Sequence, residues 1–372
     1  CDVSGDCMKL YNSSSMPVSL KKGDHVADIR TCCVSEGIPR IKKVYDVKRV
    51  YDKVEDEFMY QDFSKIKDDF DENIKQVDID PDKILSEDER RMFWEVTEHY
   101  KTVFTPRPGK YNGYYGPISN RLNFASTPVQ NTRVYTPNYS PEMKKILAEK
   151  LDKLIDWGVL VRPEDHNIQV ERISASLIVP KHEPGEYRVV TDFTGLNTHL
   201  KKIPSVSPTI AEAKQSMAKS KYIVMMDLSN YFYQGGTVAE DSQYLGTMHP
   251  FKGVLIYSCM AQGVKGASET SYERIERIFG DMVQDGRLAT MADGIYPKGN
   301  TVLECLENYA EVLRRAKLCG LTFKPSKTSI CPMKAELFGW ELDNGKWKPT
   351  VHTKSTLASY EQPKTVKQLR SY

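Results

Sequence analysis

The chain has 372 residues, of which 40% are hydrophobic and 27% charged, so it can bury ordinary cores and is expected to form two or three structural units. Its 52 basic and 50 acidic residues leave a formal net charge of +2, so any nucleic acid would have to be held by local basic patches. Eight cysteines without paired zinc-type spacing argue against a disulfide framework and favour a reducing compartment. No apolar run approaches the roughly 20 residues of a membrane helix, so we expect a cytoplasmic protein without a membrane partner. Because the chain starts at Cys1 and stops at Tyr372 in an apparent helix start, we interpret it as a segment of a longer protein.

The first third of the chain is predicted to be a β-rich unit followed by a charged linker. Short alternating runs from Met8 to Val50 indicate small β-hairpins. Mixed charges then lead into a helix predicted over 86–100, where Ser86 and the acidic residues after it are typical of an N-terminal cap. A loop rich in Pro, Gly and Tyr covers 105–117. We therefore expect a β-rich linker at 1–60, and a charged linker with a docking helix at 61–117.

The rest of the chain is predicted to be an α+β fold. Apolar residues at helical spacing predict a helix that begins at Ser140-Pro141 and ends at Gly158. Alternating runs at 174–179 and 181–191, with a turn at 183–185, predict a two-stranded ribbon. An antiparallel sheet with helices on one face fits the order that follows. The predicted strands are 222–226, 255–260 and 288–291, and the predicted helices are 268–283 and 302–318.

Two aspartates stand at the ends of predicted strands. Asp227 follows the apolar run 223–226, and Asp293 lies at the tip of a second strand pair. Carboxylates presented by adjacent strands could share divalent cations, which suits phosphoryl or nucleotidyl transfer. Each residue also has a simpler explanation, because an Asp often ends a strand and Asp293-Gly294 fits a two-residue hairpin turn. The motifs around the two residues weigh in favour of a shared site.

Six further segments carry recognisable patterns in order along the chain: 174–197, 227–234, 262–268 (QGxKG), 320–327 (GLxxxPxK), 337–340 and 363–371. Through these segments, the sequence from about residue 118 to 372 resembles the reverse transcriptase family, especially that of gypsy-type LTR retrotransposons and retrovirus-like pol polyproteins. The resemblance implies right-hand polymerase fingers and palm over 118–345 and the truncated start of a thumb over 346–372. It also implies RNA-directed DNA polymerase activity, which transfers a nucleotide from a dNTP to a primer 3′-hydroxyl with two Mg²⁺ ions. The resemblance implies that 174–197 is the fingers ribbon, 227–234 the first catalytic motif, 337–340 the primer grip and 363–371 the start of the thumb.

The resemblance also assigns roles to residues. It implies that Asp227 and Asp293 are catalytic and bind Mg²⁺ together with the carbonyl of Leu228. The implied nucleotide contacts are Lys181, Arg188, Phe232, which would reject a ribose 2′-hydroxyl, and Gln262. The implied template and primer contacts are Lys265, Gly266, Lys327, Phe338, Gly339 and Trp340. The implied partners are an RNA or DNA template with its primer, a dNTP, and other polyprotein segments such as protease and RNase H or a second subunit, with a virus-like particle as one setting.

The main departure from the family lies at Met291-Ala292-Asp293-Gly294, which takes the place of the YxDD box. Met291 replaces the tyrosine and Gly294 the second aspartate, so two carboxylates remain where the family has three. This loss is expected to weaken chiefly the metal that activates the primer hydroxyl. Loss of one preorganised electrostatic group costs roughly 10² to 10³ in rate in other enzymes. Gly294 is also expected to loosen the turn, and Pro297 and Gly299 to disrupt the second strand of the hairpin.

Three hypotheses remain open at this point. The first is a polymerase domain with weakened or lost activity. The second is a co-opted fold that binds nucleic acid or protein without polymerising, which Gly294, Met291 and a pocket-crowding Tyr231 favour. The third is a purely structural polyprotein fragment. Ser268, which stands where the family usually has Pro, is expected to cap the helix that follows it under all three hypotheses. The N-terminal third resembles, more loosely, the segment that joins protease to polymerase in such polyproteins.

Overall fold

The computed structural model describes residues 2–4, 7–9 and 68–366, except 119, 129, 135–136, 182–184, 205–206, 338, 344–345 and 360–364. The chain divides into two compact units, Cys1–Tyr45 and Asp46–Tyr372. In the first unit, β1 (Asp2–Ser4) and β2 (Cys7–Lys9) pair antiparallel. The other predicted hairpins up to residue 50 and the linker up to 67 lie outside the described residues. The domain limits at 60, 117 and 345 stay predictions.

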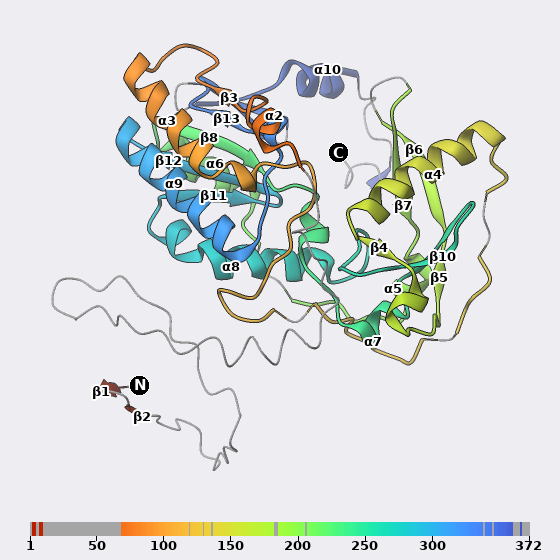
Figure 1. The fold of residues 1–372 in the computed structure, drawn as a ribbon. Helices are drawn as coiled ribbons and strands as arrows, with labels where there is room; N and C mark the ends of the chain where they lie inside the picture. Colours follow the sequence, from red (N-terminus) through yellow and green to blue (C-terminus); the bar gives the residue numbers. More distant parts are fainter. Residues whose placement is uncertain are drawn as a thin grey trace. The chain divides into compact units, whose positions relative to one another are not determined.

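A five-stranded sheet forms the centre of the second unit (Figure 1). Its order is β11-β12-β8-β13-β3, and all neighbours are antiparallel except β13 and β3. Side chains of the central strand alternate between its two faces, so Val224 and Met226 join one buried cluster and Ile223 another. The predicted strands at 222–226 and 288–291 are confirmed. The strands are β3 (Asp78–Ile79), β8 (Tyr222–Asp227), β11 (Leu288–Met291), β12 (Gly294–Gly299) and β13 (Ser329–Ile330).

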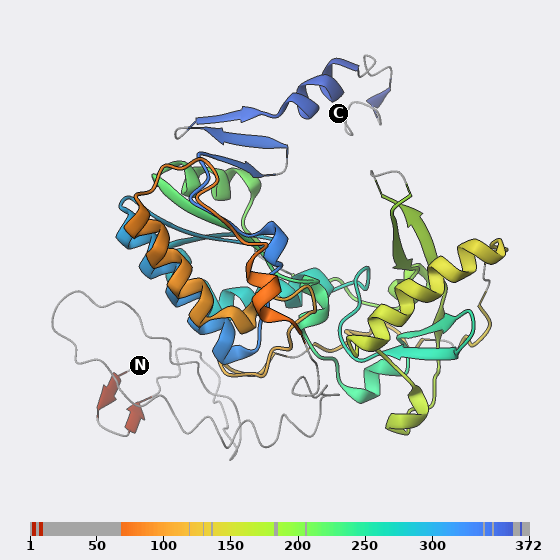
Figure 2. The same ribbon diagram turned by 45° about the horizontal axis from the view of Figure 1, so that its top comes forward.

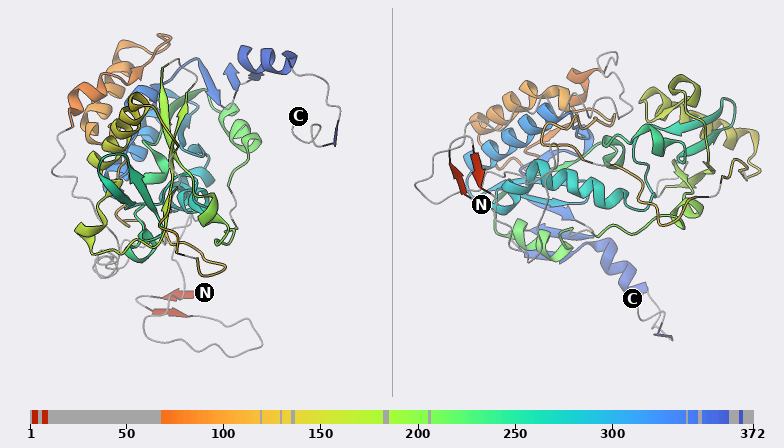
Figure 3. Two further views of the ribbon diagram at one scale, coloured as in Figure 1. Left: turned by 90° about the vertical axis from the view of Figure 1, so that its right-hand side faces the viewer. Right: turned by 90° about the horizontal axis from the view of Figure 1, so that it is seen from below.

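Three helices cover one face of this sheet, side by side in Figures 1 and 3: α3 (Glu87–His99), α8 (Ala267–Gln284) and α9 (Val302–Cys319). The expected cap of α3 is present, because Ser86 and Glu89 form a capping box. The expected cap at Ser268 is wrong. Helix α8 begins one residue earlier, after Gly266, whose left-handed backbone ends the preceding loop without a side-chain cap.

The opposite face is also covered, which the sequence pattern did not indicate. Helix α6 (Ile210–Ala218) packs against β11 and β16, and a three-stranded antiparallel sheet lies beside it. This small sheet leads directly into α10 (Val351–Ser359), as Figure 2 shows. Its strands are β14 (Lys334–Leu337), β15 (Trp340–Asp343) and β16 (Lys346–Pro349).

A second lobe contains a four-stranded sheet in the order β4-β10-β9-β5 and the separate ribbon β6-β7. Helix α4 (Pro141–Asp156) packs against both, and its N-cap Ser140 is as predicted. The predicted ribbon is confirmed, although most of its turn lies outside the described residues. The strands are β4 (Leu160–Val161), β5 (Ile173–Ser174), β6 (Ser176–Pro180), β7 (Tyr187–Thr191), β9 (Gly246–His249) and β10 (Gly253–Tyr257).

Short helical turns complete the described chain. None of the helices in the described ranges is both long and apolar enough to cross a bilayer. The mixed α+β fold predicted from the sequence is confirmed, although both faces of the five-stranded sheet are covered and not one alone. The short helices are α2 (Phe70–Ile74), α5 (Thr194–Asn197) and α7 (Ala239–Ser242), and the 3-10 turns are η3 (Lys101–Val103), η4 (Pro163–His166), η5 (Tyr231–Gln234) and η6 (Pro325–Lys327).

Pro297 and Gly299 lie inside β12 and do not disrupt it, contrary to expectation. The ladder from β12 to β8 is formed at 294–295 and 298–299 and leaves out the two residues between them, so the missing N–H of Pro297 falls in this interruption. Gly299 is needed for close packing, because a Cβ there would lie 2.6 Å from the backbone nitrogen of Cys305 in α9. Strand β12 therefore runs without a break from the hairpin at Gly294 to Gly299.

Candidate active site

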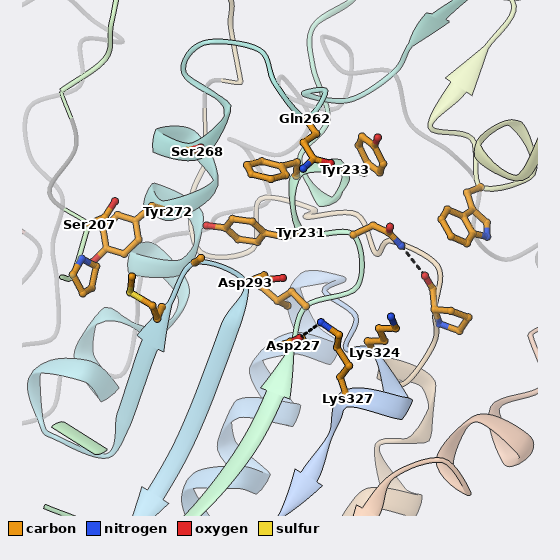
Figure 4. A pocket seen from close by; sticks show the side chains of 18 of the residues that line it. Ser207, Asp227, Tyr231, Tyr233, Gln262, Ser268, Tyr272, Asp293, Lys324 and Lys327 are labelled. Atoms are coloured by element: carbon orange, nitrogen blue, oxygen red, sulfur yellow. Dashed lines mark hydrogen bonds and ion pairs between the residues drawn. The ribbon is translucent and has the colours of Figure 1, made fainter. Parts of the chain in front are cut away.

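The two aspartates meet at one end of the central sheet, as predicted. Asp227 ends β8 and pairs with Gly294, the first residue of β12. Asp293 immediately precedes that residue, and its carbonyl accepts a hydrogen bond of 2.8 Å from the N–H of Leu228. The two side chains lie close together in Figure 4. The backbone ladder therefore fixes the spacing of the two carboxylates.

The hairpin that carries Asp293 differs from the turn suggested by the sequence. Met291 pairs with Gly294, so the two loop residues are Ala292 and Asp293, and the alternative explanation of a two-residue turn at Asp293-Gly294 is wrong. Ala292 takes the positive φ of 52° that such a tight loop demands. Gly294 is a strand residue and is absent from the described glycines with positive φ. Asp293 is consequently held at the loop tip by a strained backbone.

Lys327 forms an ion pair with Asp227. Its Nζ lies 2.7 Å from Oδ2 of the aspartate, and this contact is drawn in Figure 4. The hydrogen bond to Asp227 raises the pKa of Lys327. The pKa of Asp293 is raised by burial and by the charge of Asp227, while Lys327 lowers it. The residue predicted to contact template or primer is therefore ion-paired with one of the two carboxylates predicted to be catalytic.

A pocket of about 530 Å³ opens above the carboxylates. Its lining includes both aspartates and three lysines, Lys153 from α4 and Lys324 and Lys327 from the segment around η6. Burial lowers the pKa of Lys324, and the charges of Lys327 and Lys181 lower it further. Cations thus crowd together beside the acids, an arrangement that fits a ligand with several negative charges.

Sequence reasoning missed Lys153 and Lys324 as pocket residues. Lys324 lies within the GLxxxPxK match and could have been found there. Lys153 stands on the exposed side of an amphipathic helix, where a lysine carries no signal of function.

Tyr231, Phe232 and Gln262 also line the pocket. Tyr231 is buried, its carbonyl accepts a hydrogen bond of 2.8 Å from Nη2 of Arg274, and burial raises its pKa. Its ring centroid lies 5.2 Å from that of Phe232. The expectation that Tyr231 reaches the pocket is confirmed, and the predicted nucleotide contacts Phe232 and Gln262 lie beside it.

Gln234 joins the first catalytic motif to the 320–327 segment. Its buried side-chain amide donates to the carbonyls of Ser229, at 2.7 Å, and Thr322, at 2.9 Å, while Oε1 accepts a bond of 3.0 Å from the N–H of Thr322. The isolated bridge between Leu228 and Phe323 lies next to this network. Gln234 thereby ties Ser229, two residues after Asp227, to Thr322 in the segment that also contains Lys327.

The QGxKG loop is fastened by Asn197. The Asn197 amide donates to the carbonyl of Gly263 and accepts from the N–H of Lys265, both at 2.8 Å. The Lys265 ammonium donates to the carbonyl of Leu200 at 2.7 Å. Gly266 has a φ of 97°, which supplies the bend into α8. The ammonium of Lys265, a predicted template contact, is therefore engaged by a backbone carbonyl of the protein in this structure.

The remaining predicted contacts lie on the ribbon and the small sheet. Lys181 pairs with Glu186 at 2.8 Å, Arg188 is exposed on β7, and neither is among the described residues that line the pocket. Lys214 of α6 lies 3.3 Å from the centroid of the Trp340 ring. The carbonyl of Gly339 accepts a hydrogen bond of 2.9 Å from the N–H of Thr350. Phe338 lies outside the described residues, so the roles of this group stay predictions.

Comparison with known proteins identifies the fold. No protein-family model matches the chain. It is 24% identical over 288 residues to the Pro-Pol polyprotein of feline foamy virus, which covers 74% of this chain and 23% of that protein. The foamy viral protease-reverse transcriptase, solved with double-stranded DNA, matches with a TM-score of 0.65 at 18% identity over 85% of this chain and 62% of that chain. The chain carries a reverse transcriptase-like domain.

The same foamy viral enzyme, solved with an RNA/DNA hybrid, matches with a TM-score of 0.63 at 17% identity over 85% of this chain and 40% of that chain. The reverse transcriptase-like chain thus spans less than two thirds of the length of each of these relatives. The antiparallel-rich sheets and the helices of the chain match the reverse transcriptase polymerase fold.

The donor set of the reverse transcriptase-like site fits one divalent cation better than two. Asp227, Leu228 and Asp293 all line the pocket. Among the described residues, however, no group of three or more His, Cys, Asp or Glu side chains could hold a metal ion. Oxygen ligands suit Mg²⁺, but two ions bound side by side need more carboxylate charge than two residues supply.

Proposed function

We propose that this chain is an RNA-directed DNA polymerase domain whose catalysis is weakened by its incomplete carboxylate set. The observation that carries the proposal is the pairing of β8 with β12, which holds Asp227 and Asp293 together beneath a pocket with three lysines. The proposed reaction is nucleotidyl transfer from a dNTP to a primer 3′-hydroxyl. Its proposed partners are an RNA or DNA template with primer, and other pol segments such as protease and RNase H or a second subunit.

The residues of the chain divide the proposed work between them. Lys153, Lys324 and Lys327 would accept the negative charge of a triphosphate, with Lys181 and Arg188 reaching it from the ribbon. Phe232 and Gln262 would contact the sugar and base of the nucleotide. Both aspartates and the Leu228 carbonyl would hold Mg²⁺, which would supply positive charge to neutralise the phosphates. Lys327 would have to leave Asp227 before that carboxylate could bind a cation.

The second candidate is a domain that binds template and primer without polymerising. The ion pair between Lys327 and Asp227 favours it, because an internal ammonium already satisfies the carboxylate that a cation needs. Under either candidate function, we propose that the chain derives from a gypsy-type element and is located in the cytoplasm or in a virus-like particle. Binding under this candidate would weaken with rising salt, as counterion release requires.

A primer-extension assay separates the two candidates. Labelled primer on an RNA or DNA template is incubated with dNTPs and either Mg²⁺ or Mn²⁺, and wild type is compared with Asp227→Ala and with Glu307→Gln, which removes an exposed carboxylate on α9. The proposal expects extension by wild type and Glu307→Gln that Asp227→Ala loses. No product above Asp227→Ala, combined with salt-sensitive template binding by all three proteins, would overturn catalysis and leave the binding module.

A further inference from the structure

Position 294 is the place from which a third carboxylate would meet Asp227. Gly294 and Asp227 are directly paired across β12 and β8, and paired residues present their side chains on the same face of a sheet. On that face, Ile223 and Tyr296 belong to one buried cluster, which Met225 packs against. A side chain at 294 would therefore emerge beside the Asp227 carboxylate.

Backbone geometry does not explain the glycine. Gly294 is not among the described glycines with positive φ, and the strained residue of the hairpin is Ala292. A side chain at 294 is instead blocked by a neighbour on its own strand. A Cβ built on Gly294 would overlap both the hydroxyl oxygen and the Cζ atom of Tyr296, and its next nearest atom, Cε2 of the same ring, would be 3.0 Å away.

The Tyr296 ring is firmly placed. It is only 4% exposed and belongs to the cluster between the central sheet, α6 and the small sheet, with Met217, Ala289 and Leu337 among its members. Burial raises the pKa of Tyr296, and the charges of Asp227 and Asp293 raise it further, so the hydroxyl lies within electrostatic reach of both carboxylates. The ring does not line the pocket formed by the described residues. It fills space behind the carboxylates without taking part in the cavity.

We propose that Tyr296 is a positioning residue that occupies the space of a third carboxylate and so limits this site to a single, weakly held divalent cation. Residues 294 and 296 form a coupled pair in which a side chain at 294 is accommodated only when the one at 296 is shortened. An aspartate at 294 would then add a third carboxylate as an oxygen donor. Since greater carboxylate charge tightens the binding of hard cations, the site would then bind a divalent cation more strongly. The cation-binding part of this inference rests on the proposed function, whereas the steric part does not.

The steric part is tested by unfolding a set of variants in denaturant. Gly294→Ala is introduced into wild type, Tyr296→Phe and Tyr296→Val, and coupling is taken from the double-mutant cycles. We expect Gly294→Ala to lower the unfolding midpoint in wild type and in Tyr296→Phe, since Cζ still overlaps, and to have little effect in Tyr296→Val. An equal shift in all three backgrounds would overturn the steric part, even if some aspartate variants fail to fold.

The cation part is tested by Mn²⁺ binding, measured by electron paramagnetic resonance without substrate. We expect Gly294→Asp in the Tyr296→Val background to bind Mn²⁺ about tenfold more tightly than wild type, and Gly294→Asp alone to gain much less. Equal gains in both backgrounds would overturn the role of Tyr296. Steric coupling without tighter Mn²⁺ binding by the double variant would overturn the cation part alone, because the proposed function is tested separately by primer extension with wild type.

Discussion

Replacement of Lys327 by methionine should tighten the binding of a divalent cation to the carboxylate pair. The Lys327 ammonium lies 2.7 Å from Asp227 and competes directly for its charge. At an effective dielectric constant of about 20, two unit charges at that distance attract by roughly 6 kcal/mol. The lysine side chain is 55% exposed and the aspartate 24%, so solvent and salt screening reduce the net value. Measured pairs of this kind are worth up to about 1 kcal/mol, which predicts about fivefold tighter cation binding in Lys327→Met.

Isothermal titration with Mn²⁺ at neutral pH and fixed ionic strength measures this gain. Lys324→Met is the matched control, because Lys324 lines the same pocket but is not the residue that pairs with Asp227 in this structure. Removing Lys324 should change the affinity less, since it acts only through its more distant charge. The gain at Lys327 should also shrink as salt rises. Equal gains in both variants, or none at Lys327, would refute the idea that the ion pair competes with a cation.

Three further changes test other parts of the site. Asp293→Asn should be more stable than wild type at neutral pH and should flatten the pH dependence of the unfolding midpoint. The raised pKa of Asp293 contributes stability that is present at low pH and lost as pH rises through that pKa, and asparagine does not titrate. An unchanged dependence of the midpoint on pH would contradict this. Asn197→Ala should lower stability by about 1 to 2 kcal/mol and speed hydrogen exchange over 262–266, whereas exchange confined to other loops would argue against the clamp. Gln234→Leu should cost about 2 to 3 kcal/mol in denaturant unfolding, because it strands the N–H of Thr322 and the carbonyl of Ser229, while the carbonyl of Thr322 keeps its bond from the N–H of Ser229. A loss below 1 kcal/mol would show, on the scale of about 1 to 3 kcal/mol per stranded group, that water replaces these bonds.

The sequence by itself predicted the local elements well, because their signals lie within a few residues. Ser86 and Glu89 specify the start of α3 through reciprocal hydrogen bonds across three positions. The apolar run before Asp227 specifies β8. The order of the motifs predicted the polymerase fold and placed Asp227 beside Asp293, which the strand pairing confirms.

Sequence patterns failed where a residue has more than one suitable use. Asp293-Gly294 is typical of a hairpin loop, yet pairing with β8 draws Gly294 into the strand and leaves the strained position to Ala292. Pro297 normally ends a strand, but the β12 ladder has an interruption where its missing N–H causes no loss. Neither outcome is decided by propensities of neighbouring residues, because strand pairing overrides them.

The electrostatic character of the site was decided only by the tertiary structure. Lys327 lies 100 positions from Asp227 along the chain, so their ion pair forms only once the chain has folded, although the motif match had already placed Lys327 near the site. The sequence shows that Gly294 lacks a carboxylate, but only packing shows that the Tyr296 ring fills the space such a group would need. Contacts between distant segments depend on which strands pair and which faces they bury, and these are properties of the whole fold.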